Sequence, residues 1–463
     1  DLYVAAGGYA EPSNSPAYQD VLYVNDGKGN FTADSSALPA NFSSKFCVRA
    51  ADFNRDGKLD LFVSSRVDPE HYPRPVTSYI YRNDSRNGKI RFTNVTGTVA
   101  KDLLGIGMVC DAIWTDFDND GWPDLVLAGE WMPVTFLKNE KGVFRNVSAT
   151  SGIEEHKGWW NSILAGDFDK DGRMDYIVGN LGLNSFFRAD KDHPVRAYGG
   201  DFDKNGIYDM IPSLYLPDQK GKLQEFPAES RDDLLRQINS MRKRFPDYKS
   251  YAVATMDKVL TPDERKGAAI LEANDFRSCL LHNEGNGHFS IHPLPMQAQL
   301  SVINGMVAED FDGDGQLDLL ISGNDFGMEP VVGRSDALNG LLLKGDGKGG
   351  FQPMPMARSG IYLPGDQKAL VALRGQGNRY WLAAGQNRGP LQVFQLNSDG
   401  LRFIPLRESD ASAVLTYKDG SSRKEECGYG SSFLSESGHF LTINGPVTGV
   451  TITNSAGQTR KAL

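Results

Sequence analysis

Five short acidic loops recur along the chain, and their side chains are the ones best suited to chemistry. They read DFNRDGKLD (52–60), DFDNDGWPD (116–124), DFDKDGRMD (167–175), DFDKNGIYD (201–209) and DFDGDGQLD (310–318). Each loop carries oxygen-bearing side chains at positions 1, 3 and 5, glycine at position 6 and aspartate at position 9. Ca²⁺ prefers about six to eight oxygen ligands, and this spacing lets one short loop surround the ion. We therefore expect five calcium sites.

The expected metal ligands are the side chains at loop positions 1, 3, 5 and 9. They are Asp52, Asn54, Asp56, Asp60, Asp116, Asp118, Asp120, Asp124, Asp167, Asp169, Asp171, Asp175, Asp201, Asp203, Asn205, Asp209, Asp310, Asp312, Asp314 and Asp318. An EF-hand would carry Glu at position 12. Because that position holds Val63, Leu127, Val178, Pro212 and Ile321, the loops are not EF-hands. The alternative is an Asx turn without metal, since Asp and Asn also hydrogen-bond their own backbone.

Composition agrees with a metal-binding protein outside the nucleic-acid-binding class. The loops hold 18 of the 59 acidic residues, and the formal net charge of the 463-residue chain is -10. An acidic chain without basic runs argues against a nucleic-acid partner. No apolar run reaches the roughly 18 residues of a membrane span. The opening DLYVAAGG places Asp1 at position 9 of a loop, so we expect the sequence to start inside a repeat, with any targeting segment upstream.

The elements that position these loops also repeat. An apolar run follows position 9 in most loops (LDLFV, PDLVL, MDYIV, LDLLI) and is typical of a buried strand. Strand pairs joined by Asn, Asp and Gly turns then follow, which is the pattern of hairpins. These are VLYVNDGKGNF (21–31), YIYRNDSRNGKIRF (79–92), TFLKNEKGVF (135–144), CLLHNEGNGHF (279–289) and LLLKGDGKGGF (341–351). Four strands in roughly 50 to 65 residues predict the blades of a β-propeller.

Counting these units predicts an all-β fold with a seven-bladed β-propeller over residues 1–406. The units are a truncated first (1–35), three with loops 52, 116 and 167, one around 268–289 without an acidic loop, one with loop 310, and a degenerate last at 369–396. Loop 201 lacks a preceding strand of its own in this count. We therefore assign it to the outer part of the fourth blade.

Two segments interrupt the repeat. Residues 230–260 have helical spacing, with Leu234, Leu235, Ile238 and Met241 on one face, and Ser230 with Asp233 forms a capping box. Pro246 would divide this insert, about 228–262, into two helices that cover a sheet edge, or alternatively dock a partner. Residues 407–463 alternate as short strands without an acidic loop. They predict a small C-terminal β domain.

The loops and hairpins resemble the FG-GAP/VCBS repeats of integrin α-subunit heads and bacterial surface proteins, over about residues 1–406. The tail, with YKDGSSRKEECGYGSSFLSES before VTGVTITNSAGQTR, is similar to the ASPIC/UnbV domain. It departs from that pattern at Glu436, where Gln is usual, and at NSAG, where WPxG is usual. GNLGLNSFF, FPAESRDDLLRQI and GNDFGMEPVVGRSDALNG further resemble Bacteroidetes-type outer-membrane lipoproteins. That resemblance implies a cell-surface protein near SusC/SusD-like importers of glycans or peptides.

A ligand is expected on the face opposite the acidic loops. Consecutive strands run antiparallel, so the connections from the second to the third strand lie on that opposite face, and long loops on a rigid scaffold are where binding residues concentrate. Aromatic, amide and charged groups there suit sugars or peptides. The alternative is that these polar groups satisfy one another and the loop backbone. The candidates are Arg66, His71, Tyr72, Glu130, Trp131, Trp159, Trp160, Asn180, Asn324, Asp325, Arg334, Gln386 and Arg388.

An enzyme is the second class of function. Glu70, Glu130, Asp325 and Glu329 are candidate acids of a lyase or hydrolase, with His71 beside Tyr72 as base and acid. No nucleophile elbow, HExxH motif or phosphate loop is present in the sequence. Cys47, Cys110, Cys279 and Cys427 are expected as buried free thiols. The sequence therefore favours a calcium-stabilised recognition module at the cell surface, without catalysis, that binds a glycan, a peptide or a partner protein.

Overall fold

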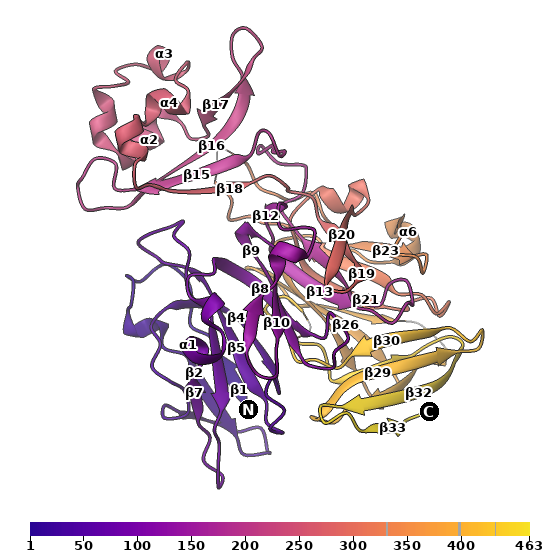
Figure 1. Ribbon diagram of the computed structural model, residues 1–463. Coiled ribbons are helices and arrows are strands. Elements are labelled where there is room, and N and C mark those ends of the chain that lie inside the picture. The colour runs from indigo at the N-terminus through magenta and orange to yellow at the C-terminus, as the bar shows by residue number, and fades with distance from the viewer. Residues whose placement is uncertain (330–331, 397–399, 431) are drawn as a thin grey trace.

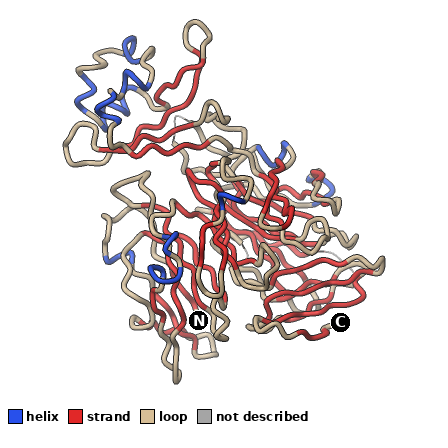
Figure 2. Tube along the Cα trace, in the orientation of Figure 1, coloured by secondary structure: helices blue, strands red, loops and turns tan. Residues whose placement is uncertain are grey.

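The computed structural model describes residues 1–329, 332–396, 400–430 and 432–463, and within them it is all-β (Figure 1). Nine small antiparallel sheets account for the described strands. Helices are short and gather mainly in one projecting part, as Figure 2 shows. No helix in the described ranges is long and apolar enough to cross a membrane. The predicted all-β class is confirmed.

Three sheets of the repeat pattern fill the N-terminal part. The first holds β1 (Leu2–Val4), β2 (Val21–Asn25) and β3 (Phe31–Asp34). The second holds β4 (Ser44–Ala51), β5 (Asp60–Val67), β6 (Tyr79–Asn83) and β7 (Phe92–Asn94). The third holds β8 (Met108–Thr115), β9 (Asp124–Pro133), β10 (Thr135–Asn139) and β11 (Phe144–Asn146), with β12 (Lys157–Trp159) added beside β9. Acidic loops 52 and 116 join β4 to β5 and β8 to β9.

Three further sheets continue the pattern. The fourth holds β13 (Ser162–Gly166), β14 (Asp175–Gly179), β19 (Cys279–Gly285) and β20 (His288–Pro293). The fifth holds β21 (Ile303–Glu309), β22 (Asp318–Gly323), β23 (Leu341–Gly345) and β24 (Phe351–Met354). The sixth holds β25 (Gln367–Arg374), β26 (Tyr380–Gln386) and β27 (Gln392–Leu396). The short helices between elements are α1 (Thr96–Val99), α6 (Met356–Ser359), η1 (Pro16–Tyr18), η2 (Lys101–Leu103), η3 (Ser148–Thr150) and η5 (Met296–Gln299).

The predicted seven units reduce to these six sheets among the described residues. The unit placed around 268–289 was wrong, because its two halves belong to different sheets. Its second half is β19 and β20, which complete the fourth sheet by pairing with β14. Its first half is β18 (Ala269–Ala273), which lies in an inserted sheet. The insertion separates β14 from its hairpin, so strand spacing along the sequence misled the count.

The inserted sheet has the order β17-β16-β15-β18 and projects from the rest of the molecule beyond β9 and β12 (Figure 1). It adds β15 (Val195–Gly200), β16 (Asp209–Pro217) and β17 (Leu223–Pro227) to β18. Loop 201 joins β15 to β16, so its assignment to the outer part of the fourth blade was wrong: β15 is the strand that precedes it. The helical stretch forms four helices and one 3₁₀ turn rather than two helices: α2 (Arg231–Gln237), η4 (Asn239–Arg242), α3 (Tyr248–Tyr251), α4 (Met256–Val259) and α5 (Pro262–Arg265).

The predicted apolar face of this stretch is confirmed. Ser230 caps α2 by accepting a hydrogen bond from the Asp233 backbone N–H. The four predicted core residues are all buried, and they pack with Tyr198 and Ile211 of the inserted sheet. The helices therefore cover the sheet of their own insertion. The burial stabilises helices that are too short to persist alone.

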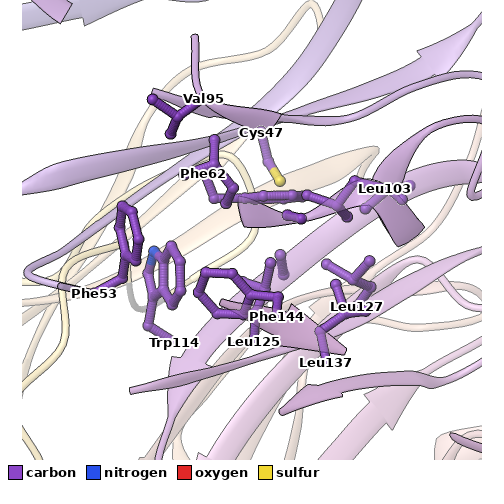
Figure 3. Close-up of a cluster of buried hydrophobic side chains, with 14 of the residues drawn as sticks. Cys47, Phe53, Phe62, Val95, Leu103, Trp114, Leu125, Leu127, Leu137 and Phe144 are labelled. Carbon is purple, nitrogen blue, oxygen red and sulfur yellow. The ribbon is translucent and has the colours of Figure 1, made fainter. Parts of the chain in front are cut away.

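In loops 52, 116, 167 and 310, the phenylalanine at position 2 joins one repeat sheet to the next. Phe53 stacks on Trp114 at 6.4 Å and meets Phe144 at 5.5 Å, both in the following sheet (Figure 3). Phe117 and Phe168 make the same contact with Phe289 and Phe351, at 6.4 and 5.4 Å. Phe144, Phe289 and Phe351 are the last residues of the hairpin motifs at 135–144, 279–289 and 341–351. These acidic loops are therefore anchored to the core between successive sheets.

The C-terminal part forms two more sheets. Strand β28 (Arg402–Pro405) pairs with β31 (Phe440–Ile443), and a second sheet has the order β30-β29-β32-β33. Its strands are β29 (Asp410–Tyr417), β30 (Ser422–Glu426), β32 (Val447–Asn454) and β33 (Thr459–Lys461). Between β30 and β31 the chain returns to the repeat sheets: the carbonyl of Ser432 accepts from Arg49 of β4, and its hydroxyl donates to Leu370 of β25 at 2.7 Å. This segment therefore joins the second and the sixth sheets.

Candidate metal loops and the opposite loop face

The acidic loops share one preformed conformation. In loop 167, both carboxylate oxygens of Asp167 accept backbone hydrogen bonds, from Asp171 at 3.0 Å and Gly172 at 3.2 Å. The residue at position 4 and the glycine at position 6 both have positive φ in this loop, 63° at Lys170 and 82° at Gly172. Glycine occupies that conformation without the cost that a side chain brings. The Gly of the motif is therefore a requirement of the turn.

In four of the five loops, the aspartate at position 9 ties the loop to the third strand of its sheet. Asp60, Asp124, Asp175 and Asp318 accept a backbone N–H from that strand, at 2.7, 2.6, 2.8 and 3.0 Å. Where the donor residue is Asn139 or Asn283, its side chain also donates to the preceding loop, at Phe53 and Phe117. This explains why the acidic loop and the Asn-containing hairpin recur together.

Four loops bring three candidate metal ligands within 4.8 Å of one another. The groups are Asp116, Asp118 and Asp124; Asp169, Asp171 and His282; Asp201, Asp203 and Asp209; and Asp310, Asp312 and Asp318. Loop 52 forms no such group among the described residues. Its Asn54 side chain donates to Asp56 at 3.4 Å instead. Several Asp-rich groups are thus positioned to hold a metal ion.

Buried carboxylate oxygens without a hydrogen-bond partner show that these loops fit a cation. Among the described residues they include one oxygen each of Asp60, Asp116, Asp124, Asp203 and Asp209. Asp60, Asp124 and Asp209 are fully buried. A buried, unpartnered carboxylate is costly, and a bound cation removes that cost. The donor set is entirely oxygen apart from His282, which suits a hard ion such as Ca²⁺.

The pKa values of the loop carboxyl groups also favour a bound cation. Burial, reinforced by neighbouring loop carboxylates, raises the pKa of Asp124 to about 9 and that of Asp60 to about 7. Burial also raises the pKa of Asp209 and of Asp318 to about 6. Each loop therefore disfavours its own ionised form unless a positive charge is present.

At three of the loops, a basic side chain that was not predicted reaches the carboxylates from the third strand. Lys138 pairs with Asp118 and lies 3.1 Å from Asp120. Lys344 pairs with Asp312 and lies 3.0 Å from Asp314, and His282 lies 3.0 Å from Asp169. The sequence contained a signal for these side chains, because each basic residue directly precedes the Asn or Gly of its hairpin motif (LKN, LHN, LKG). A cation at these loops must share them with these side chains.

The opposite face contains an ion pair and an aromatic group among the predicted ligand residues. Arg66, at the end of β5, pairs with Glu130 of β9, and the Arg66 side chain is 38% exposed. Trp131 donates from its indole nitrogen to the Tyr72 hydroxyl at 2.8 Å. Trp131 and Trp159 meet edge to face at 5.0 Å. The structure therefore brings together these five predicted residues, which come from β5, the connection after β5, β9 and β12.

The inserted sheet packs against this aromatic group. Trp159 contacts Phe276 at 5.0 Å and Phe187 at 5.1 Å, and the same cluster contains Val195 of β15. His71 pairs with Asp68 at 3.0 Å and meets Tyr208 of the insertion at 5.6 Å. Much of the predicted ligand site is therefore an apolar joint between the repeat sheets and the insertion.

Three predicted ligand residues lie in the interior instead. Trp160 and Asn180 are 0% exposed and Asn324 is 1% exposed. Asn180 donates to the carbonyls of Asp275 and Arg277, and Asn324 donates to those of Leu338 and Gly365. For these amides the alternative given above holds, because they satisfy loop backbone. Trp160 is part of the hydrophobic core.

The remaining candidates lie at or near the surface. Asp325 accepts from the Gly327 backbone at 2.9 Å, and Arg334 lies over the Phe326 ring at 4.6 Å. Gln386 donates to the Pro390 carbonyl at 3.0 Å, and Arg388 is exposed. Of the acids considered for catalysis, Glu70 accepts from the Ser13 backbone at 3.1 Å and Glu329 is exposed. Residues 330 and 331 of the 323–334 loop lie outside the described residues.

A large cavity lies on the acidic-loop side, where no ligand site was predicted. Its volume is about 1140 Å³, and it opens between the C-terminal part and loops 52 and 116. Its lining includes Asp52, Arg55, Asp116, Arg407 and Glu426. All four cysteines are buried and free, as predicted.

Comparison with known proteins supports the repeats. The FG-GAP-like repeat family matches residues 1–63 and 116–178. The chain carries FG-GAP-like repeats. It is 26% identical over 182 residues to cartilage acidic protein 1 of Mus musculus, a match that covers 37% of this chain and 26% of that protein. The chain thus spans about a quarter of the length of this relative.

Two solved structures share a distant likeness. The crystal structure of BBS1N in complex with ARL6DN, soaked with mercury, is 10% identical over 79% of this chain and 95% of that chain, with a TM-score of 0.21. The exotype rhamnogalacturonan lyase YesX is 11% identical over 94% of this chain and 76% of that chain, with a TM-score of 0.25. At these TM-scores neither likeness identifies a fold or an activity.

Proposed function

We propose that this chain is a calcium-stabilised extracellular recognition module whose repeat sheets form the blades of a β-propeller. The observation that carries the proposal is the set of buried, unpartnered carboxylate oxygens in the acidic loops. FG-GAP repeats are typical of extracellular domains, which supports a place outside the cell. The proposal extends to the bacterial outer membrane, alongside a SusC/SusD-like importer, on the sequence resemblance alone.

About five Ca²⁺ ions would be held by the side chains at loop positions 1, 3, 5 and 9. When bound, the ion supplies positive charge and fixes the loop; it has no catalytic role in this proposal. The protein itself prepares the sites of loops 52, 116, 167 and 310 through the position 9 aspartate, which links the loop to the third strand, and through the phenylalanine at position 2. Metal would therefore stabilise the contact between successive sheets.

Recognition is proposed for the connections that follow the second strands. Three exposed rings lie in these connections: Tyr9 is 81% exposed, Phe186 is 44% exposed and Phe326 is 36% exposed. Arg334 lies over the Phe326 ring, so an aromatic surface and a cation are presented together. Such a combination suits the apolar faces of sugars and the side chains of peptides. A glycan or peptide is therefore the ligand class that we propose, with no catalysis.

Metal analysis and a binding array test both halves of the proposal. Elemental analysis of the purified chain is expected to find calcium, and a glycan and peptide array is expected to return ligands without product formation. Phe326→Ala should weaken binding of the best array ligand about tenfold. The matched control is Phe31→Ala, which removes an exposed ring from β3 in the first sheet. It should leave ligand binding unchanged. Product formation, or an unchanged Phe326→Ala, would contradict the proposal.

A further inference from the structure

The C-terminal sheet rests on three of the acidic loops through β30 and the turn before β32. The Lys424 backbone donates to Asp167 at 2.8 Å, and the Asn444 side chain donates to the Asp310 carbonyl at 2.8 Å. At loop 116 the direction differs: Glu426 accepts a hydrogen bond from the Asp116 backbone at 2.9 Å. Among the described residues, loop 116 thus receives a carboxylate from the C-terminal sheet.

Several carboxylate oxygens of the described residues at this contact lack a hydrogen-bond partner. Within the part of the chain that the structure describes, Glu426 Oε2 and Asp116 Oδ1 are both buried and have no hydrogen-bond partner. In the same loop Asp124, which is fully buried, also has one unpartnered oxygen. Lys424 is the nearby cation, but its ammonium lies 3.5 Å from the other oxygen of Glu426 and 3.9 Å from the other oxygen of Asp116. One ammonium therefore leaves three buried acid oxygens without a partner.

The charges at this contact do not balance. Lys424 brings one ammonium to 3.5 Å from Glu426 and 3.9 Å from Asp116, which carry two carboxylates. Two carboxylates that approach each other out of water repel strongly unless a cation lies between them. A single short loop also leaves room in the coordination of Ca²⁺, which prefers about six to eight oxygens.

We infer that Glu426 is a ligand, supplied by the C-terminal sheet, for the cation that loop 116 holds. The inference rests on the proposed binding of calcium by that loop. The other ligands are the loop's own Asp116, Asp118, Asp120 and Asp124. A metal ion bound by both parts joins them, so that calcium binding and docking of the C-terminal sheet strengthen each other by the same factor.

The geometry limits this effect to one site. At loop 167 the C-terminal sheet provides a donor, Lys424 N–H, and at loop 310 it provides the Asn444 amide. Neither donor can coordinate a cation through the atom that makes the contact. Removing the Glu426 carboxylate is therefore expected to change loop 116 and to leave the other loops as they are.

The test is calorimetric titration of the metal-stripped full chain with Ca²⁺. Glu426→Gln keeps the size of the side chain and one oxygen acceptor but loses the charge, and it should weaken one site about tenfold. The matched control is Glu408→Gln, an exposed glutamate of the same C-terminal part, which should titrate like the wild type. Hydrogen exchange of residues 422–426 in the wild type should slow when calcium is added.

The outcomes separate this inference from the proposed function. A wild type that binds no calcium overturns the proposed function and the inference with it. A wild type that binds calcium, with Glu426→Gln unchanged at every site, overturns the inference alone and shows that Lys424 suffices at this contact. If Glu426→Gln does not fold, hydrogen exchange of the wild type tests the inference. A rate of exchange in residues 422–426 that is the same with and without calcium overturns it.

Discussion

The inserted sheet and the C-terminal sheet dock on the repeat sheets by different chemistry. The insertion meets the connections after the second strands through apolar contacts, with Phe276 against Trp159 at 5.0 Å. The C-terminal sheet meets the acidic loops through hydrogen bonds and charges, such as Lys424 to Asp167 and Lys170 over Tyr417 at 4.1 Å. In Figure 1 the two parts lie at opposite ends of the molecule.

This difference determines how strongly salt and metal affect the stability of each joint. Burial of apolar surface responds little to salt or metal, whereas exposed charge pairs weaken as ionic strength rises. Loops 116, 167 and 310 all touch the C-terminal sheet, so their metal content reaches it directly. Loop 201 lies within the insertion and touches this joint with the ring of Tyr208, which meets His71 at 5.6 Å, while the rest of the joint is the apolar cluster around Trp159.

Removal of calcium should have the largest effect on this comparison. A ligand that binds only the native state adds about 2.7 kcal/mol per site at a hundredfold excess over Kd. Several sites together should lower the melting temperature by on the order of 10 °C when the protein is stripped of metal. Hydrogen exchange should rise in residues 422–426 well before it rises in residues 269–276.

Two results would break the comparison. A melting curve that is the same with and without metal would remove calcium from the stability of the fold. Equal rises of exchange in both parts would show that the acidic loops hold the whole molecule together, not the C-terminal joint in particular.

Loss of the aromatic contact between Phe276 and Trp159 should loosen the insertion and leave the C-terminal sheet unchanged. Phe276 is 3% exposed, and Phe→Ala in a packed site costs about 3–5 kcal/mol. Phe276→Ala should raise exchange in β15 and β18 while the calcium affinity of loop 116 stays unchanged by calorimetry. Phe31→Ala removes a ring of the same size from an exposed site and serves as the control. Release of the C-terminal sheet in Phe276→Ala would show that the two joints are coupled.

Stability of the metal-free protein should fall as pH rises. Asp60, Asp124 and Asp209 have a raised pKa in the folded chain, to about 7, 9 and 6, whereas an unfolded aspartate has a pKa of about 3.9. Between these values the native state holds protons that the unfolded chain has released, so each pH increase disfavours the native state. Melting of metal-stripped protein from pH 5 to 8 should show a decline of several degrees.

Saturating calcium should remove most of this decline, because the carboxylates are then ionised ligands. Asp124→Asn offers a check, since an amide at this position cannot titrate and should flatten the metal-free profile. A metal-free profile that rises with pH would mean that the buried carboxylates are already paired with cations of the protein.

The local parts of this molecule were predictable from sequence, because they depend on close neighbours. Loop spacing, the Gly at position 6 and the cap at Ser230 all follow from interactions within a few residues. Pairing of β14 with β19 was not predictable, since residues 180–278 lie between them and nothing local marks the return of the chain.

The exposure of polar residues at strand ends was equally hidden. Asn180 and Asn324 were expected to face a ligand, yet the carbonyls that they satisfy come from segments distant in the sequence. Glu426 belongs to a run of charges with no spacing motif, so its contact with Asp116 appears only when the chain is folded.

The smallest expected effect concerns the lysine that shares loop 116 with the proposed metal. The Lys138 ammonium pairs with Asp118 and Asp120, so Ca²⁺ must displace it or bind against its charge. Lys138→Met should therefore raise the calcium affinity of this loop by roughly threefold to tenfold, which corresponds to about 1 kcal/mol for a partly exposed ion pair. It should also lower the melting temperature of the metal-free protein, since Asp118 and Asp120 then lose the ammonium that pairs with them. Lys101→Met, an exposed lysine outside the loops, is the control in both titration and melting. If Lys138→Met weakens calcium binding instead, the ammonium is holding Asp118 and Asp120 in the geometry that the ion needs, and loop 116 is organised by its own cation before calcium arrives.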